Sequence, residues 1–241
     1  MDTPKPLEAL RIKIYADDAK LDEMIELAQL PNVHGFTTNP NLMRKAGVED
    51  YETYAKETVA AIPNKPISFE VCADDEMEME RQARIIHSWG ENVYVKIPVT
   101  NTKGESTAGL ISKLSSEGMK LNVTLIFSPA QIDAVASALA PETPAIVSVF
   151  AGRIADVGFD PLPLMRAAKE RLADRPHAEL LWASCRELFN IYEAERAGSD
   201  IITVPYDMLK KTFRIGMDLD MLSLEGVKAF YEDGKAAGFN L

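Results

Sequence analysis

Residues 121–150, LNVTLIFSPAQIDAVASALAPETPAIVSVF, carry the pattern that decides the predicted fold. Two short β-branched runs, at 121–127 and 145–150, flank a segment whose apolar residues recur at spacings of three and four: Ile132, Val135, Ala136 and Leu139. Short β-branched runs are typical of buried strands, and the three-and-four spacing is typical of an amphipathic helix. The stretch therefore predicts a strand–helix–strand unit, in which the connecting helix makes the two strands parallel.

Six further runs of the same kind lie along the chain, at 12–16, 33–36, 67–71, 93–99, 179–183 and 200–204. Successive runs start about 20–35 residues apart, which is the length that a strand with its crossover helix requires. Eight such units in 241 residues favour a single domain, residues 1–241, built as a closed (β/α)8 barrel. An open Rossmann-like sheet is the alternative, but no GxGxxG or GxxxxGK(S/T) motif is present. The amphipathic segment 224–237 predicts an additional C-terminal helix.

Composition and charge argue against several classes of protein. The chain is 46% apolar and 26% charged, as globular proteins are, and no apolar run approaches the roughly 20 residues that a bilayer span requires. No membrane association is expected and, without a recognisable secretory signal, a cytoplasmic location is expected. The net charge of -11 argues against nucleic-acid binding. The two cysteines and three histidines lack the spacing of zinc ligands, so no metal is expected.

Lys96 is the least expected residue in a predicted strand. In the run VYVKIPVT, residues 93–100, its ammonium group is flanked by Val95 and Ile97, and the strand should be covered on both faces. Burial of an isolated charge is costly, so the amine must pair with a carboxylate or lose its proton. An uncharged amine can attack a carbonyl and form an imine. A structural ion pair explains the same burial, and this strand alone leaves both explanations open.

Acidic and polar side chains on other predicted strands favour the catalytic explanation. Asp17 follows the first strand and Glu70 lies in the third, where carboxylates can carry the protons that imine formation and carbon–carbon cleavage require. Each acid alone is more often a helix cap or an ion-pair partner, but together with Lys96 they form a candidate catalytic group. Asn122 and Thr124 alternate on one face of the fifth strand, where they can hold a water or substrate, or serve as ordinary strand residues.

Two arginines follow the sixth and seventh predicted strands. Arg153 and Arg186 fall in the region of a barrel where phosphate sites are often built. Two guanidinium groups at one face of an acidic protein suggest bidentate recognition of an anion, although each arginine alone also fits a surface salt bridge. Ser148 and Ser184 precede the arginines and can add hydroxyl donors, or fill space as small residues.

Five segments, in this order along the chain, resemble the signature segments of the transaldolase family: GFTTNPNL (35–42), VKIPVT (95–100), LNVTLIFSPAQ (121–131), SVFAGRIADVG (148–158) and ASCR (183–186). The resemblance covers nearly the whole chain. It implies a (β/α)8 barrel whose fourth-strand lysine forms a Schiff base with a ketose phosphate, and Lys96 is the matching position. It implies no metal or organic cofactor, because the protonated imine itself stabilises the carbanion that cleavage leaves.

The same resemblance implies a role for each candidate residue. Asp17 would take the C4 hydroxyl proton during retro-aldol cleavage, while Glu70 and Thr124 would position the water of imine formation and hydrolysis. The residues implied to bind the dihydroxyacetone unit are Thr37, Asn39 and Asn122. The residues implied to bind the phosphate are Arg153, Arg186, Ser148 and Ser184. Ring-shaped oligomers occur among the short family members that this chain resembles, so a homo-oligomer is expected.

Two activities within the family remain open. A transaldolase passes a dihydroxyacetone unit from sedoheptulose 7-phosphate or fructose 6-phosphate to an aldose phosphate, in the pentose phosphate pathway. A fructose 6-phosphate aldolase-like enzyme releases free dihydroxyacetone. Glu70 and Phe150 resemble the transaldolase choices, since the aldolase branch commonly has glutamine and tyrosine there, whereas the chain length is closer to the short, aldolase-containing subfamilies. We expect a transaldolase that acts on sugar phosphates.

A sugar-phosphate-binding barrel without turnover is the alternative outside the enzymes. It is disfavoured because a binding module has no use for an imine-forming amine together with two acids. The sequence also departs from the usual family pattern at four positions, where threonine, serine, proline and phenylalanine are frequent: Asp18, Asn41, Val149 and Cys185. These departures bear on the preferred acceptor sugar more than on the mechanism.

Overall fold

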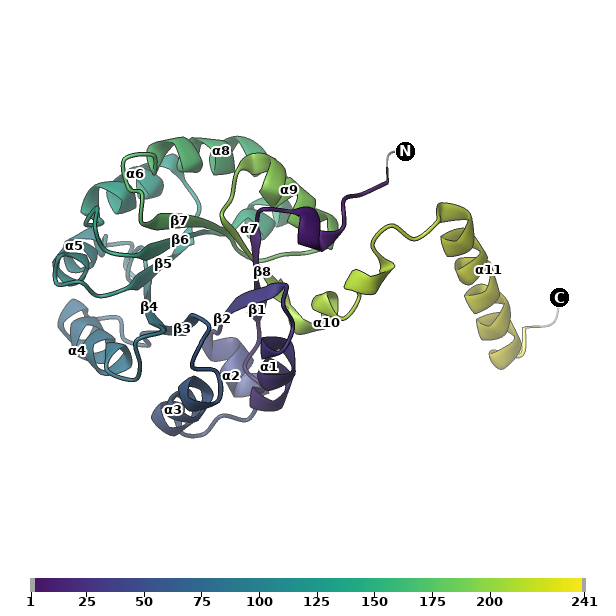
Figure 1. Cartoon of the computed structure of the whole chain (residues 1–241), viewed down its shortest axis with the longest axis horizontal. Coiled ribbons are helices and arrows are strands. Elements are labelled where there is room, and N and C mark those ends of the chain that lie inside the picture. Colours follow the sequence, from purple (N-terminus) through teal and green to yellow (C-terminus); the bar gives the residue numbers. More distant parts are fainter. Residues whose placement is uncertain (1–2, 240–241) are drawn as a thin grey trace.

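Eight parallel strands form a closed barrel in which each strand pairs with the next and β8 pairs with β1 (Figure 1). The computed structural model describes residues 3–239. The strands are β1 (Lys13–Asp17), β2 (Val33–Thr37), β3 (Ile67–Glu70), β4 (Val93–Pro98), β5 (Leu121–Ile126), β6 (Ala145–Val149), β7 (Ala178–Trp182) and β8 (Ile201–Pro205). The predicted (β/α)8 barrel is confirmed, and each predicted strand lies within about one residue of the observed one at either end. The single-domain assignment of residues 1–241 stays a prediction.

Helices follow the strands and surround the barrel (Figure 1). They are α1 (Leu21–Ala28), α2 (Pro40–Lys45), α3 (Tyr51–Ala61), α4 (Glu76–His87), α5 (Ala108–Ser116), α6 (Pro129–Ala138), α7 (Ala151–Asp156), α8 (Leu162–Arg171), α9 (Phe189–Ala197), α10 (Tyr206–Leu209) and α11 (Leu219–Ala236), with 3-10 turns at Leu7–Ala9 and Thr212–Arg214. Local sequence explains where helices begin. Ser128 caps α6 and Gln131 returns the bond to the Ser128 backbone, while Pro129 occupies the first turn.

Alternation along the strands separates two buried layers. Residues such as Val95 and Ile97 face outward and pack against the helices, and the residues between them face the barrel interior. The apolar part of the interior is a small cluster made of Tyr15, Ile146, Leu181, Ala183 and Ile201. Gly35 makes room for one of these side chains, because a Cβ at Gly35 would lie 2.6 Å from the Tyr15 ring. We call the residues that face the barrel interior the inner layer, and the residues that pack against the helices the outer layer.

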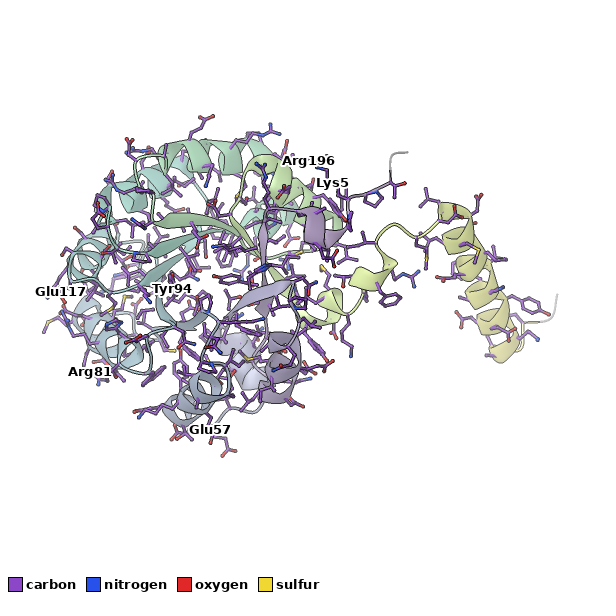
Figure 2. The ribbon with its side chains drawn as sticks, viewed as in Figure 1. Lys5, Glu57, Arg81, Tyr94, Glu117 and Arg196 are labelled. Atoms are coloured by element: carbon purple, nitrogen blue, oxygen red, sulfur yellow. The ribbon has the colours of Figure 1, made fainter. Side chains whose placement is uncertain are left out.

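Helix α11 lies apart from the barrel (Figure 1), and none of its residues is buried. The side chains of the strands and surrounding helices interleave, whereas those of α11 project from an isolated helix (Figure 2). The predicted C-terminal helix is confirmed but starts five residues earlier, at Leu219 rather than Leu224, because the Asp218 side chain accepts hydrogen bonds from the first-turn N–H groups. Within residues 3–239, the structure contains no helix with the length and apolar character needed to cross a membrane.

Candidate active site

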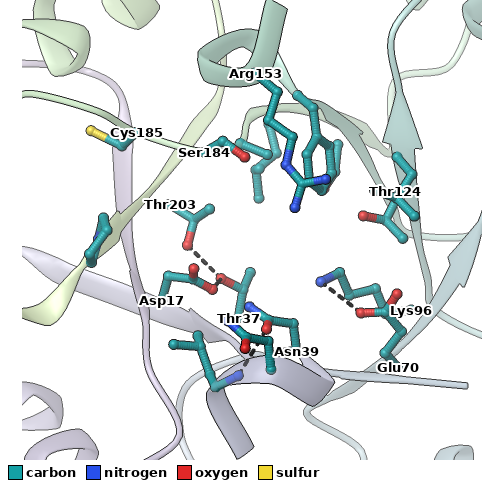
Figure 3. Close-up of a pocket in the computed structure, with 18 of the residues that line it drawn as sticks. Asp17, Thr37, Asn39, Glu70, Lys96, Thr124, Arg153, Ser184, Cys185 and Thr203 are labelled. Carbon is teal, nitrogen blue, oxygen red and sulfur yellow. Dashed lines mark hydrogen bonds and ion pairs between the residues drawn. The ribbon is translucent and has the colours of Figure 1, made fainter. Parts of the chain in front are cut away.

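A cavity of about 520 Å³ opens at the carboxyl ends of the barrel strands (Figure 3). Its size is in the range of small-molecule sites, and this end of a (β/α)8 barrel is where active sites are built. Of the twelve predicted site residues, only Asn122 is absent from its lining. The lining contains Asp17, Thr37, Asn39, Glu70, Lys96, Thr124, Ser148, Phe150, Arg153, Ser184 and Arg186.

The Lys96 amine is buried and held by two partners. Its Nζ lies 3.1 Å from Glu70 Oε2 and donates a hydrogen bond of 3.0 Å to the backbone oxygen of Thr38. Glu70 and Lys96 are paired residues on the adjacent strands β3 and β4, so the register of the sheet brings them together. The buried amine therefore has the carboxylate partner that its sequence context requires. An ammonium group has three donors, and these two partners leave one for a ligand.

Asp17 faces Lys96 across the same space (Figure 3). Its Oδ1 accepts a hydrogen bond of 2.8 Å from Thr37 Oγ1, and Thr37 Oγ1 is in turn bonded to Thr203 Oγ1. Burial raises the pKa of the Asp17 carboxyl, while the nearby Lys96 charge and the Thr37 bond lower it in part. A carboxylate with a raised pKa is a better proton acceptor than an exposed one.

Thr124 presents a hydroxyl without a partner. Its side chain is fully buried, yet Oγ1 has no hydrogen bond to any residue within 3–239. Beside it, Leu125 has a φ of 61° and the β5–β6 register shifts between Val123 and Ile126, so the strand bulges at the cavity. A buried hydroxyl at a cavity needs an explanation, and a bound water or ligand would satisfy it.

The opposite side of the cavity carries a cation. The Arg153 guanidinium lies 5.1 Å from the centre of the Phe150 ring and forms no ion pair with any carboxylate of residues 3–239. Its helix, α7, approaches the end of β7 closely: a Cβ on Gly152 would lie 1.6 Å from the backbone oxygen of Ser184. Ser184 itself has a φ of 63°, and its side chain lines the cavity near Arg153 (Figure 3). Strained backbone of this kind is common at binding sites.

The sequence model of one protein family, described as Transaldolase/Fructose-6-phosphate aldolase, matches residues 14–241. The chain belongs to this family. The resemblance seen in the five sequence segments is thereby confirmed, and a lysine, two acids and an unpaired arginine around one barrel mouth form the candidate site of this transaldolase-family chain.

Relatives of similar length carry matching names. A "Probable transaldolase" of Dehalococcoides mccartyi is 35% identical over 226 residues, which cover 93% of this chain and 99% of the relative. A "Probable transaldolase" of Roseiflexus sp. is 37% identical over 229 residues, covering 93% and 98%. "Probable transaldolase 2" of Listeria monocytogenes is 34% identical over 226 residues, covering 93% and 97%. These similarities support an enzyme of the aldolase and transaldolase class.

A solved structure supports the fold. The crystal structure of dihydrodipicolinate synthase from Rhodopseudomonas palustris matches with a TM-score of 0.56, covering 88% of this chain and 77% of that one. The two sequences are 12% identical, so this likeness concerns the barrel architecture alone.

Asn122 lies below the cavity of this transaldolase-family barrel. Its Nδ2 donates a hydrogen bond of 2.9 Å to Ser68 Oγ, and its Oδ1 accepts a hydrogen bond of 2.7 Å from Ser148 Oγ. Both ends of the amide are therefore engaged inside the inner layer, and the side chain is fully buried. Ser148 does line the cavity, so Asn122 reaches the site through this serine.

Arg186 differs from Arg153 because it already has an anionic partner. Its Nε lies 3.1 Å and 3.0 Å from the two carboxylate oxygens of Asp156, and a second nitrogen also contacts Asp156. The pair joins α7 to the segment that follows β7, and both side chains are about half exposed. An incoming anion at Arg186 must therefore share or displace the Asp156 contact.

Several lining residues were not among the candidates predicted from the sequence. Thr203 lies on β8 and bonds Thr37, whereas the predicted site residues lie on or directly after the first seven strands. Its alternation with Ile201 and Pro205 could have placed it on the inner face. Asn41 and Cys185, noted before only as departures from the family pattern, also line the cavity.

Proposed function

We propose that this protein is a transaldolase that transfers a dihydroxyacetone unit from a ketose phosphate to an aldose phosphate through a Schiff base on Lys96. The observation that carries the proposal is the buried Lys96 amine, held by Glu70 and the Thr38 carbonyl and facing Asp17 across the cavity. The family match supports the reaction class.

The first step would form the imine. Glu70 accepts a proton from Lys96, and the neutral amine attacks the C2 carbonyl of the ketose to give a carbinolamine. Glu70 then gives this proton to the carbinolamine hydroxyl, which leaves as water, and a protonated imine remains. The unpartnered Thr124 hydroxyl, close to Lys96 in Figure 3, is suited to hold this water and, later, the water that hydrolyses the imine.

The second step would break the C3–C4 bond. Asp17 takes the proton of the C4 hydroxyl, the aldehyde product leaves, and the bond electrons move into the protonated imine to give an enamine. The acceptor aldose then adds its aldehyde carbon to the enamine, and Asp17 returns the proton to the new hydroxyl. The raised pKa of Asp17 suits both directions, because this carboxyl holds a proton more firmly than an exposed one.

Substrate contacts would divide between the two sides of the cavity. Arg153 and Ser184 are suited to bind the phosphate, since Arg153 forms no ion pair within the part of the chain that the structure describes. The Phe150 ring packs against this guanidinium, with its centre 5.1 Å away. Arg186 would add to this site only by sharing its Asp156 contact.

The dihydroxyacetone end would lie near Lys96. Thr37, Ser148 and the free amide nitrogen of Asn39 would bind its hydroxyl groups, because the Asn39 oxygen already caps α2 by accepting from Leu42 N–H. Asn122 would act through Ser148 rather than by direct contact.

Borohydride reduction with fructose 6-phosphate tests the Schiff base. The wild-type chain should gain a covalent adduct that peptide mass spectrometry assigns to Lys96, and Lys96→Met should gain none. Lys113→Met is the matched control, since Lys113 is an exposed lysine paired with Glu80 on the helical surface. An unmodified wild-type protein would contradict the proposal and favour a sugar-phosphate-binding barrel.

Acceptor dependence separates the two family activities. With Glu70 and Phe150 in the site, fructose 6-phosphate should be consumed only when erythrose 4-phosphate is supplied. Release of free dihydroxyacetone without an acceptor would instead assign the chain to the fructose 6-phosphate aldolase-like branch. The assay follows both glyceraldehyde 3-phosphate and dihydroxyacetone.

A homo-oligomer remains part of the proposal. Helix α11 buries none of its residues against the barrel and exposes apolar side chains that a second copy would cover: Leu219, Met221, Leu222, Leu224, Val227, Phe230 and Tyr231. Light scattering should give a mass of several subunits for the intact chain, and a mass of fewer subunits for a chain that ends at residue 217. The cytoplasmic location and the place in the pentose phosphate pathway stay predictions.

A further inference from the structure

Three oxygen-bearing side chains from three strands form a continuous chain of hydrogen bonds that ends at Asp17 (Figure 3). The Oγ1 atoms of Thr203 on β8 and Thr37 on β2 form a hydrogen bond of 2.5 Å. Thr37 Oγ1 in turn donates a hydrogen bond of 2.8 Å to Asp17 Oδ1 on β1. Both threonines are nearly excluded from solvent, with 6% and 3% of their surface exposed. Water therefore competes little for these hydroxyl groups.

Counting hydrogens fixes the direction of each bond. A charged carboxylate has no hydrogen to give, so Thr37 must donate its single hydroxyl hydrogen to Asp17. Thr37 then has only lone pairs for Thr203, so Thr203 must be the donor in the second bond. The chain thus runs from Thr203 through Thr37 to Asp17, and each donor polarises the next.

Asp17 depends on this chain more than on any other donor. In the part of the chain that the structure describes, Thr37 is the one group that donates a hydrogen bond to the Asp17 carboxyl. The charged groups that face Asp17 are Lys96 on β4, whose charge lowers its pKa, and Glu70 on β3, whose charge raises it. Burial is the largest influence and raises the pKa, so the donors determine how far that rise is offset.

We propose that Thr203 is a positioning residue for the proton-transfer step: its hydroxyl donates to Thr37, fixes the Thr37 hydrogen on Asp17 Oδ1, and leaves Asp17 Oδ2 to accept the substrate proton. The inference rests on the proposed function, in which Asp17 takes the C4 hydroxyl proton. Proton balance is kept, because the substrate proton resides on Oδ2 and returns from it, while the two threonine hydrogens stay in place.

Loss of the Thr203 hydroxyl changes Thr37 as well as Asp17. Without a donor behind it, Thr37 gives a weaker hydrogen bond and its hydroxyl is free to rotate toward the cavity. The charged form of Asp17 then loses support, so its pKa rises further and more of the Asp17 carboxyl is protonated at a given pH. A protonated Asp17 cannot take the substrate proton. Turnover should fall, and the acid side of the pH profile should move to higher pH.

The experiment compares Thr203→Val with Thr203→Ser. Valine keeps the shape of threonine without the hydroxyl, and serine keeps the hydroxyl. The pH profiles of kcat and kcat/KM are measured with fructose 6-phosphate and erythrose 4-phosphate. Thr203→Val should lower kcat about five- to tenfold, the loss typical of one neutral hydrogen bond, and should move the acid limb upward by about half a pH unit or more. KM should change less than kcat, because Thr203 is not among the residues proposed to bind the substrate and Thr37 keeps a lone pair that can accept from a substrate hydroxyl.

Serine and a remote threonine serve as controls. Thr203→Ser should restore both kcat and the acid limb. Thr58→Val removes another fully buried hydroxyl, which donates to the Tyr54 backbone oxygen in α3 outside the barrel, and should leave the pH profile unchanged. If the valine variant does not fold, Thr203→Cys, which keeps a weak donor of similar size, should show a smaller shift in the same direction. An unmoved acid limb in the folded valine or cysteine variant, or an equal shift in the serine variant, overturns the inference.

Borohydride trapping separates this inference from the proposed function. Thr203→Val should still give the Lys96 adduct with fructose 6-phosphate, since imine formation does not use Asp17 in the proposed mechanism. If the wild-type chain itself gives no adduct, the proposed Schiff-base function is wrong, whatever the Thr203 variants show. If the wild type gives the adduct and the valine variant gives none, Thr203 supports the whole site and the specific positioning role is wrong.

Discussion

Asp17 and Asp18 are neighbours in the chain but lie in different layers of the barrel. Asp17 belongs to the inner layer, lines the cavity and has a threonine donor. Asp18 is buried, with 6% of its surface exposed, whereas Asp17 is half-buried. Asp18 lies outside the cavity, just before α1, where its Oδ1 accepts from Ala19 and Lys20 N–H and its Oδ2 has no partner within residues 3–239. Alternation at the end of β1 thus points Asp17 into the cavity, where it is available for chemistry, and points Asp18 away from it, where its burial lowers stability.

Burial raises the pKa of both carboxyls, with different accompanying charges. For Asp18 burial is again the largest cause, the two backbone N–H groups oppose it, and the neighbouring Glu23 adds to it, so that its pKa is raised to about 6. For Asp17 the Lys96 charge is the main opposing influence. The comparison predicts that inner-layer substitutions change turnover, whereas outer-layer substitutions change stability without changing turnover.

Asp17→Asn should have the largest effect. Removing the proton acceptor should lower kcat by about 10³- to 10⁴-fold, within the range for loss of a general base. The same variant should melt at a higher temperature near pH 7.5, because a buried carboxylate charge is removed. Steady-state kinetics and thermal melting check the two results. A variant that keeps activity within tenfold would remove Asp17 from the proposed mechanism.

Arg153→Ala should raise KM for fructose 6-phosphate by about 10- to 100-fold, because Arg153 has no anionic partner to share its charge with. Arg186→Ala should raise KM less, by about threefold, since Asp156 already occupies that guanidinium group. Arg171→Ala, which removes an exposed arginine on α8 that pairs with Asp133 on α6, is the control and should not alter KM. Equal effects of the Arg153 and Arg186 variants would show that the Asp156 pair opens freely when phosphate binds.

Asp18→Asn should stabilise the protein while leaving kcat within about twofold of wild type. The folded-state pKa is raised above the unfolded value of 3.8, so the folded state binds the proton more tightly than the unfolded state. Stability is therefore fully present below the unfolded pKa and is lost as pH rises toward about 6.

Above that pH the asparagine variant should gain about 2 kcal/mol, or about 4–8 °C in melting temperature. Urea unfolding at pH 4 and pH 7.5 measures the difference, which should nearly vanish at pH 4. Asp22→Asn, at an exposed position on α1, is the control. A gain of the same size at both pH values would mean that the buried charge is not its source.

Ile97→Val should have the smallest effect. Ile97 is fully buried in the outer layer directly after Lys96, and loss of one methylene there should cost about 1 kcal/mol of stability. The kinetic constants should not change, because the side chain points away from the cavity. A change in kcat would show that packing behind β4 tunes the Lys96 amine, and the separation of the two layers would then be incomplete.

Strand order, barrel closure and most of the cavity could be predicted from sequence because each depends on local patterns. β-branched runs at regular spacing define the strands, and polar residues at their ends define the mouth. Lys96 could be predicted to need a carboxylate, and Glu70 supplies it through strand register. These predictions needed only periodicity and the cost of burying charge.

Other features depend on depth and on contacts between distant segments. Inward residues of tilted barrel strands lie at different heights, so Asn122 lies below the cavity although Thr124, two residues later, reaches it. The Asp156 contact to Arg186 joins segments 30 residues apart, so no local sequence pattern predicts it. The left-handed backbone conformation of Ser184 also could not be predicted from the sequence, because serine has no preference for that conformation.

The pairing of Glu70 with Lys96 across β3 and β4 has a consequence for engineering. The spacing of amine and carboxylate is set by sheet hydrogen bonds, whereas the Asn41, Arg153 and Arg186 side chains come from the segments after the strands. Libraries that randomise those segments can therefore alter which sugar is accepted while the amine and its acid keep their separation. Grafting the two residues into another parallel barrel requires copying the strand register, not the loops.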